Sequence, residues 1–213
     1  MDNLLKKLLK NRLKQDFYLR ETPLVAQELL GKLLVIAHDD TLLIGKIVET
    51  ESYQSNDPAS HSYRGKTERN SAMFGPVGRA YVYINYGIHH GFNIVARNIE
   101  QNAGGVLIRA LEPLQGIESM KKNRKQKFSD QNIHDLTNGP GKLTQALGIT
   151  KEYNHFNLSR SSHIFITDDI LTNQQTFAIG TSSRIGISKG KQYQWRFFIE
   201  DNPFVSYFKK NNS

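Results

Sequence analysis

The stretch Ile47-Val-Glu-Thr-Glu-Ser-Tyr53 places two carboxylates and an aromatic ring on one predicted β-strand. Side chains alternate between the two faces of a strand, so Glu49, Glu51 and Tyr53 are expected to share a face. Two carboxylates on one face of a core sheet are costly, because a buried charge needs a partner that replaces water. The arrangement is typical instead of a catalytic pocket built on a sheet.

Two carboxylates at this spacing on a strand have Cα atoms about 6.5–7 Å apart, near the separation used by glycosidic acid–base pairs. The alternative is that one glutamate only forms an ion pair with a surface arginine. Arg109 and Asn93 lie in segments expected to neighbour this strand, and His61 follows in the next loop. A carboxylate that is held by an arginine and can orient a water is a hydrolytic general base. These residues alone do not separate Glu49 from Glu51.

The rest of the pattern predicts a single α+β domain, because neither a repeat nor a linker divides the chain. The predicted strands cover residues 32–37, 42–53, a hairpin at 80–96, 105–111 and much of 162–208. The predicted helices run from Thr22 as N-cap to Gly31, from Glu112-Pro113 through Met120, and over Leu143–Leu147. The polar segment Gln54–Val77 is too long for a simple connector and is expected either to carry function or to be disordered.

Composition limits the classes of protein to consider. A chain of 213 residues is long enough for one well-buried domain and short for two. Its 38% hydrophobic content and mean hydropathy of −0.51 are typical of a soluble globular protein. The excess of 28 Lys and Arg over 20 Asp and Glu, with a pI near 9.6, favours a polyanionic partner. The absence of cysteine excludes disulfides, zinc–thiolate sites and cysteine nucleophiles, and it fits a reducing compartment.

The N-terminal segment has a basic amphipathic pattern. Five leucines from Leu4 to Leu13 recur at helical spacing, with lysines and an arginine opposite them. Such a pattern is compatible with a membrane-surface helix, an organellar presequence, or a helix or arm docked on the domain. We favour the last, because the apolar face is narrow and no small-residue cleavage site follows. Residues 1–16 are therefore expected to form a basic helix or arm, and residues 17–208 the domain.

The predicted hairpin is rich in tyrosine. Tyr81 and Tyr83 share one face of its first strand, where an aromatic residue belongs to a core as readily as to a binding site. Tyr86 lies at the turn beside Gly87, which is free to adopt a positive φ. An exposed tyrosine at the loop tip of a basic protein could insert between bases and fill the gap left by an extruded nucleotide.

Three further motifs are less specific. Asn138-Gly-Pro-Gly-Lys142 precedes a predicted helix and could present backbone N–H groups and Lys142 to a phosphate, although an ordinary glycine turn explains it equally well. It lacks the spacing of a nucleotide-binding P-loop. His89 and His90 are adjacent and point in different directions, which makes a poor metal pair. The basic run at residues 121–127 is expected to be solvated.

Taken in order, these motifs resemble the 3-methyladenine DNA glycosylases of the alkyladenine type. The resemblance covers about residues 18–206 and rests on Val48-Glu-Thr-Glu-Ser-Tyr53, Ala59-Ser-His-Ser62, Arg69-Asn70, Met73-Phe74, Tyr81-Val-Tyr-Ile-Asn-Tyr-Gly87, Asn93-Ile94, Leu107-Ile-Arg-Ala-Leu-Glu-Pro113, Asn138-Gly-Pro-Gly-Lys142 and Arg184-Ile-Gly186. It implies a single mixed domain around a curved antiparallel sheet flanked by helices. It also implies hydrolysis of the N-glycosidic bond of alkylated and deaminated purines without a metal or cofactor.

The resemblance further implies how the water is activated. Glu51 matches the general base, and this match alone distinguishes it from Glu49. Arg109 and the main-chain carbonyl of Ile185 match the groups that help to hold the attacking water.

The resemblance implies a base pocket as well. Tyr53 and His61 match the aromatic walls between which a flipped base stacks, with Tyr83 beside them. Asn93 matches the residue that crowds the 2-amino group of guanine, and Tyr86 matches the intercalating wedge.

Two other classes of protein remain as alternatives: a non-catalytic nucleic-acid-binding module, and a hydrolase of small glycosides or nucleosides. The first has no need of Glu51 together with Arg109 and Asn93, and the second has no need of Tyr86 or a charge of +8. We therefore predict a monomeric, monofunctional DNA glycosylase of the bacterial cytoplasm, associated with the nucleoid, that starts base excision repair on double-stranded DNA. Its expected lesions are 3-methyladenine, 7-methylguanine and hypoxanthine. A lyase step is not expected, because no lysine adjoins Glu51 in the strand.

Overall fold

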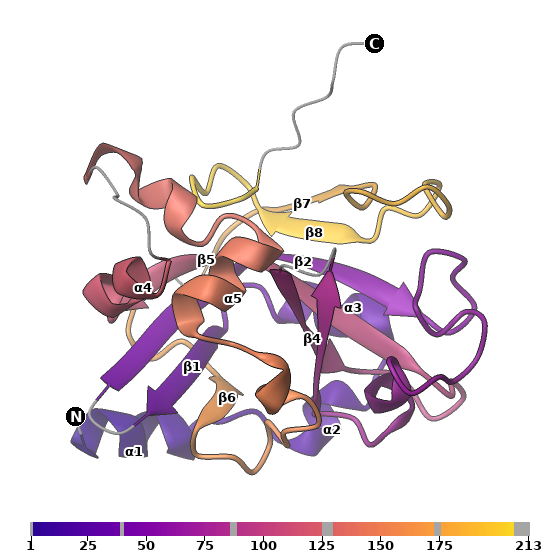
Figure 1. The fold of residues 1–213 in the computed structure, drawn as a ribbon, viewed down its shortest axis with the longest axis horizontal. Helices are drawn as coiled ribbons and strands as arrows, with labels where there is room; N and C mark the ends of the chain where they lie inside the picture. The colour runs from indigo at the N-terminus through magenta and orange to yellow at the C-terminus, as the bar shows by residue number, and fades with distance from the viewer. Residues whose placement is uncertain (1, 39–40, 86–88, 125–129, 173–175, 207–213) are drawn as a thin grey trace.

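The computed structural model of this chain describes residues 2–38, 41–85, 89–124, 130–172 and 176–206. In these residues eight antiparallel strands form one curved sheet with helices around it (Figure 1), as the α+β prediction requires. The strands are β1 (Leu33–His38), β2 (Thr41–Gln54), β3 (Ala80–Asn85), β4 (His89–Val95), β5 (Gly104–Gln115), β6 (Ile164–Thr167), β7 (Ile179–Ser182) and β8 (Arg196–Ile199). The helices are α1 (Asp2–Lys10), α2 (Gln15–Tyr18), α3 (Thr22–Glu28), α4 (Ile117–Asn123) and α5 (Pro140–Leu147), with 3-10 turns at Ser71–Phe74, Asp130–Leu136 and Lys151–Tyr153.

Strand β2 lies at the centre of the sheet. One of its edges pairs with β5 over almost the whole length of the strand. The other edge pairs first with β1 and then, from Glu49 to Glu51, with β8. The strand order is β3-β4-β5-β2-β1-β6, and β7 extends the sheet beyond β8. Because β1 and β8 share one edge of β2, the sheet divides beside the two glutamates.

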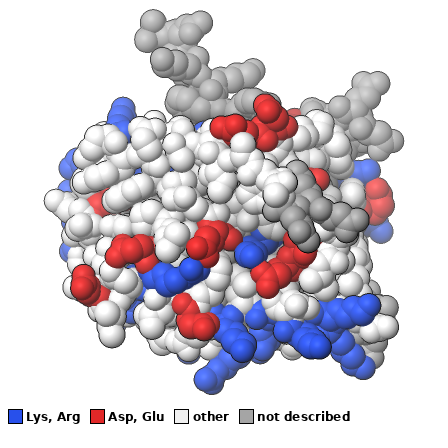
Figure 2. All heavy atoms as spheres, turned by 180° about the vertical axis from the view of Figure 1, so that it is seen from behind, with Lys and Arg blue, Asp and Glu red and all other residues white. Residues whose placement is uncertain are grey.

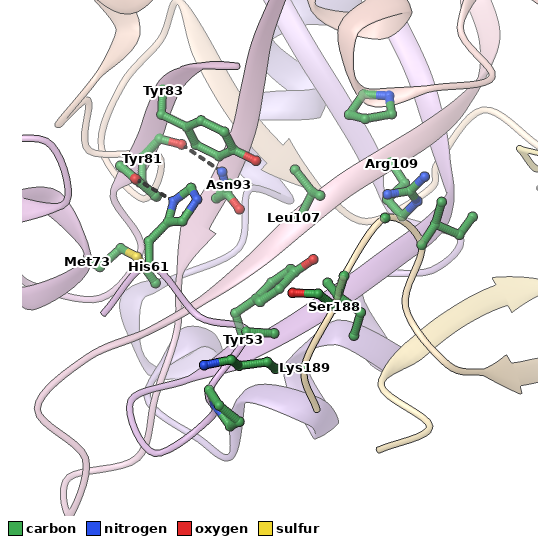
Figure 3. A pocket seen from close by; sticks show the side chains of 16 residues that line it. Tyr53, His61, Met73, Tyr81, Tyr83, Asn93, Leu107, Arg109, Ser188 and Lys189 are labelled. Carbon is green, nitrogen blue, oxygen red and sulfur yellow. Dashed lines mark hydrogen bonds between the residues drawn. The ribbon is translucent and has the colours of Figure 1, made fainter. Parts of the chain in front are cut away.

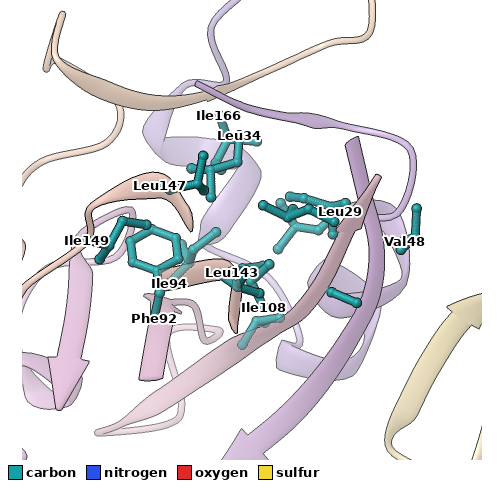
Figure 4. Packing of buried hydrophobic residues seen from close by; sticks show 14 of the residues in the cluster. Leu29, Leu34, Val48, Phe92, Ile94, Ile108, Leu143, Leu147, Ile149 and Ile166 are labelled. Atoms are coloured by element: carbon teal, nitrogen blue, oxygen red, sulfur yellow. The ribbon is translucent and has the colours of Figure 1, made fainter. Parts of the chain in front are cut away.

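Both faces of β1 are buried from Leu33 to Ile36, which explains the apolar run in this part of the strand. Leu34 faces the larger core, where Leu29 beside α3 and Leu143 of α5 pack against the sheet (Figure 4). Leu33 faces the opposite way, into a smaller core that contains the fully buried Leu8 of α1. Alternation along one strand therefore serves two cores.

Helix α1 uses its apolar side to cover the smaller core. Leu4, Leu5 and Leu9 are partly buried against the same cluster as Leu8, whereas the lysines at positions 6, 7, 10 and 14 are exposed. Figure 2 shows Lys and Arg side chains gathered along the lower edge of the face seen from behind. Among the described helices, none is long and apolar enough to cross a membrane.

The prediction that Thr22 is the N-cap of helix α3 is wrong. Glu21 precedes the first helical residue of α3, and the buried Thr22 hydroxyl donates a hydrogen bond to the Ala96 carbonyl (3.0 Å). A distant partner has replaced the local capping bond that the sequence suggested. Helix α5 also begins earlier than predicted, with Pro140 in its first turn, where a missing N–H costs nothing.

The predicted helix start at Glu112-Pro113 is also wrong. Strand β5 continues to Gln115, and α4 begins only after Gly116, whose φ of +79° turns the chain. Pro113 pairs with Gly45 next to an irregularity in the register, a place where a strand tolerates proline. The C-terminal region is less strand-rich than predicted, because β6, β7 and β8 are short and separated by turns.

Candidate active site

One row of paired residues runs across five strands. Tyr81 of β3 pairs with Asn93 of β4, which pairs with Leu107 of β5, then Glu51 of β2 and Arg196 of β8. Directly paired residues lie on the same face of a sheet. Their sequence neighbours on β3, β4 and β5 belong to the larger core, so the row faces away from that core.

A pocket of about 390 Å³ lies over this row (Figure 3). Its volume falls within the roughly 300–1,000 Å³ typical of small-molecule sites. The lining brings together most of the predicted site residues: Tyr53, His61, Tyr83, Asn93, Arg109 and Ile185. They come from four strands, the long polar loop and a segment near residue 185, so that loop contributes to the pocket wall as expected.

Glu51 is fully buried behind this lining. Its Oε2 accepts a hydrogen bond from the Tyr53 hydroxyl (2.7 Å), and its Oε1 accepts one from the Ile185 backbone N–H (2.7 Å). Arg109 Nη1 lies 3.3 Å from the same Oε1. All three partners line the pocket, so the carboxylate lies immediately behind the pocket surface.

Glu49 is equally buried but has different partners. Its Oε1 accepts hydrogen bonds from Arg109 Nε (3.0 Å) and Arg196 Nε (2.6 Å). The Ser206 backbone N–H donates to Oε2 (2.8 Å), and the Ser206 hydroxyl lies 2.6 Å and 2.8 Å from the two oxygens. A carboxylate occupied in this way by donors from the protein is poorly placed to take a proton from water.

The two glutamates fix the protonation of their neighbours. Burial alone would lower the pKa of Arg109, but Glu51 and Glu49 outweigh this effect and raise it, so the guanidinium stays charged. Burial, and then the charge of Glu51, raises the pKa of Tyr53 well above its ordinary value, so its hydroxyl stays a donor. Glu51 therefore lies between a permanent cation and a neutral hydroxyl.

Arg184 lies behind the Tyr53 wall, and sequence reasoning assigned it no role. Its guanidinium carbon lies 4.6 Å from the centre of the Tyr53 ring and 5.3 Å from that of Trp195. Asp57 holds the guanidinium through both carboxylate oxygens, and Nη1 also donates to the Ser52 carbonyl (2.8 Å). This buried pair fixes the Tyr53 ring from behind. No local signal reveals it, because its partners lie 127 positions apart.

His61 packs among the tyrosines of β3. Its Nδ1 lies 2.9 Å from the Tyr81 hydroxyl, and its ring meets that of Tyr83 edge-on with centroids 4.6 Å apart. Burial, followed by the charge of Arg69, lowers the pKa of His61, so the ring is neutral at pH 7. A neutral imidazole can lie against a cationic base without charge repulsion.

Asn93 and Gly91 shape the wall formed by β4. Asn93 is 5% exposed, and its Nδ2 donates to the Tyr81 carbonyl (3.2 Å), which holds the amide in place. Gly91 lies opposite Tyr83 in the register, and a Cβ there would lie 2.8 Å from the Tyr83 ring. The missing side chain thus lets the Tyr83 ring lie across β4. A glycine inside a strand is the signal that could have revealed this close approach.

The histidines at the start of β4 help to attach the hairpin to α5. Thr144 donates to the His90 carbonyl (3.0 Å), and a Cβ on Gly141 would lie 3.0 Å from the His89 side chain. Helix α5 thereby supports the strands that carry the pocket. In the part of the chain that the structure describes, no group of three or more His, Cys, Asp or Glu could hold a metal ion.

Three predicted contacts stay predictions. The Ile185 group that contacts the buried glutamate is its backbone N–H, and the carbonyl has only its predicted role. Lys142 donates to Asp135 (2.9 Å) and Asn138 (2.7 Å), so a phosphate would have to compete with these partners. The predicted wedge, Tyr86, lies outside the described residues.

Comparison with known proteins agrees with this geometry. Residues 16–203 match the family described as methylpurine-DNA glycosylase (MPG). The chain belongs to the methylpurine-DNA glycosylase family. Similar curated proteins are provisionally named 3-methyladenine DNA glycosylase. One from Carboxydothermus hydrogenoformans is 45% identical over 91% of this chain and 98% of its own. Others come from Clostridium perfringens strain 13 (46%; 92% and 98%) and Francisella tularensis strain SCHU S4 (47%; 85% and 91%).

Membership in the methylpurine-DNA glycosylase family confirms the predicted family and fold class. It also confirms a DNA glycosylase activity that removes alkylated purines in DNA repair, with damaged DNA as the substrate. The roles of single residues are not tested by these similarities and stay predictions.

Proposed function

We propose that this methylpurine-DNA glycosylase excises 3-methyladenine and 7-methylguanine from double-stranded DNA, and hypoxanthine as a second class of lesion, with Glu51 as general base. The observation that carries the proposal is the position of Glu51, fully buried behind an aromatic pocket and held by Arg109 and Tyr53. A general base must lie within hydrogen-bond reach of the proton it takes. A water bound between Arg109 and Ile185 would meet this condition.

The pocket suits a flipped, positively charged purine. An enzyme that acts on a base must first extrude it from the stack, and Tyr86 is proposed to fill the gap that remains. Alkylation at N3 or N7 makes the purine cationic, and a cation is attracted to the face of an electron-rich ring. Tyr53, His61 and Tyr83 supply such rings around the pocket.

The chemistry proposed here is a displacement at the sugar. The water oxygen bonds to C1′ while the C1′–N bond breaks, and Glu51 accepts the proton that the water loses. For an alkylated purine, the electron pair of the broken bond neutralises the cationic base, which leaves without a proton donor. Hypoxanthine is neutral, so its departure requires a proton as well. The products are free base and an abasic site, and no covalent intermediate with a lysine forms, as expected for a monofunctional enzyme of this family.

Contacts with the DNA backbone are proposed at the rim. Lys189 lines the pocket and is exposed, so its ammonium group could contact a phosphate beside the flipped nucleotide. Lys142 is proposed as a further phosphate contact once it leaves Asp135. We also propose that the enzyme acts as a monomer in the cytoplasm, with residues 1–16 as a basic extension of the domain at 17–208.

Base release from three substrates tests the proposed function. The wild-type chain is incubated with methylated duplex DNA, the same duplex without methylation, and free methylated nucleosides. The expected result is free 3-methyladenine from the methylated duplex alone, with abasic sites that become strand breaks only after alkali. Equal release from nucleosides would favour a small-glycoside hydrolase. Tight binding to the duplex without release would favour a non-catalytic module.

A further inference from the structure

Glu49 is a buried charge that the proposed mechanism does not use. It is 0% exposed and lies two residues from the proposed base on the same strand. Charged side chains are almost never fully buried unless they are paired. Two guanidinium groups, those of Arg109 and Arg196, and both donors of Ser206 surround it. Glu49 therefore has a full set of hydrogen-bond donors although it lies beside the active site.

Arg109 divides its guanidinium between the two glutamates. Its Nε donates to Glu49 Oε1 at 3.0 Å, while its Nη1 lies 3.3 Å from Glu51 Oε1. A planar guanidinium that is free to turn prefers to hold one carboxylate with two parallel N–H groups. Glu49 occupies the Nε side of Arg109 and leaves Glu51 a single, longer contact. A carboxylate held in this weaker way keeps more of its ability to accept a proton.

The C-terminal part of the chain holds Glu49 in turn. Arg196 contacts it from β8 with Nε at 2.6 Å, and its other nitrogens donate to Ser182 Oγ and to the Ser206 carbonyl, each at 3.0 Å. The Ser206 N–H and hydroxyl complete the shell of donors. Two arginines and two glutamates balance in charge, so the cluster is neutral as a unit.

We propose that Glu49 is a positioning residue for the glycosylase reaction, because it binds Arg109 through Nε and so holds the guanidinium where Nη1 is the nitrogen that contacts Glu51. This inference rests on the proposed function, in which Glu51 is the base. Glu49 belongs to a sequence motif that resembles the family, but the resemblance implies no role for it.

The effect on the pH dependence follows from the charges around Glu51. Among the described residues, the titratable and charged groups that face Glu51, line the pocket or stack on Tyr53 are Glu49, Tyr53, His61, Tyr81, Tyr83, Arg109, Arg184, Lys189 and Arg196. Neutralising Glu49 removes the nearby negative charge and weakens its hold on Arg109 Nε, so that Arg109 can turn further toward Glu51. Both changes stabilise the carboxylate of Glu51 and make it a weaker proton acceptor.

The test is Glu49→Gln under single-turnover conditions on a methylated duplex, from acid to neutral pH. The excision rate at neutral pH is expected to fall by up to about tenfold. This loss is smaller than the roughly 10²–10⁴-fold acceleration that a general base supplies. The acid limb of the rate profile is expected to move to lower pH, with affinity for an abasic duplex within about twofold of wild type. An unshifted limb, or a wild-type rate, would overturn the proposal. Wild-type base release in the same assay tests the proposed function separately.

A double-mutant cycle separates positioning from a structural role. In an Arg109→Met background, Glu49→Gln is expected to slow excision less than about twofold further, because Glu49 acts through Arg109. An equal loss in both backgrounds would contradict the proposal. Should Glu49→Gln fail to fold, Arg109→Lys keeps the buried charge but loses the flat fork that contacts both glutamates. A folded Arg109→Lys enzyme with the wild-type rate would overturn the proposal as well.

Discussion

At the scale of single residues, the two neighbouring glutamates of β2 differ in their hydrogen-bond partners and not in residue type. Glu49 contacts two guanidinium groups and Ser206. Glu51 contacts a tyrosine hydroxyl, one backbone N–H and Nη1 of Arg109. Alternation along the strand predicted their common face, and the structure confirms it. The structure adds that Glu51 alone has partners that all line the pocket.

Asn93 is proposed to provide the selectivity against guanine. Its amide is fixed by the Tyr81 carbonyl and lines the pocket, so the exocyclic 2-amino group of guanine would meet it. Asn93→Ala is expected to raise release of guanine and 7-methylguanine relative to hypoxanthine by about fivefold or more, since a buried polar group without a partner costs about 1–3 kcal/mol. Competition assays on duplexes that carry each base measure the ratio. An unchanged ratio would remove Asn93 from the explanation of selectivity.

At the scale of elements, alternation predicted the strands, while distant pairing determined the site. The period of two in β2 and β3 predicted which residues share a face, but it left open whether Tyr83 belongs to the core or to a binding site. The partners Arg184 and Arg196 come from far along the chain, and nothing local indicates which carboxylate each will meet. The same reason explains the wrong N-cap, since the bond of Thr22 to a carbonyl 74 positions away competes with capping.

The docking of α1 on the sheet is expected to stabilise the folded protein. Leu8 is fully buried between α1 and the sheet, so Leu8→Ala should lower the free energy of unfolding by about 2–5 kcal/mol. Denaturant unfolding measures this change, with Leu24→Ala as a matched control because Leu24 is 42% exposed. The excision rate per folded molecule should stay at the wild-type value. Equal, small effects of both substitutions would show that α1 contributes little to the fold.

At the scale of the whole molecule, positive charge and a neutral buried site coexist. The net charge of +8 comes from exposed lysines and arginines, including those of α1, whose apolar side is already covered by the sheet. Figure 2 shows Lys and Arg side chains gathered along one edge of the face that it draws. Such a field attracts a polyanion from a distance and makes its binding salt-dependent. Inside, paired charges balance around the pocket that is proposed to receive the base.

Glu51 is proposed to take the proton of the attacking water, and the excision rate of Glu51→Gln decides this role. The amide keeps the shape of the side chain but cannot accept that proton. Single-turnover excision of 3-methyladenine from duplex DNA is expected to fall by about 10²–10⁴ or more, while affinity for an abasic duplex stays within about twofold. Glu118→Gln, the same change at an exposed glutamate of α4, is the matched control and should leave the rate unchanged. A Glu51→Gln enzyme that excises 3-methyladenine at the wild-type rate would show that Glu51 is not the general base.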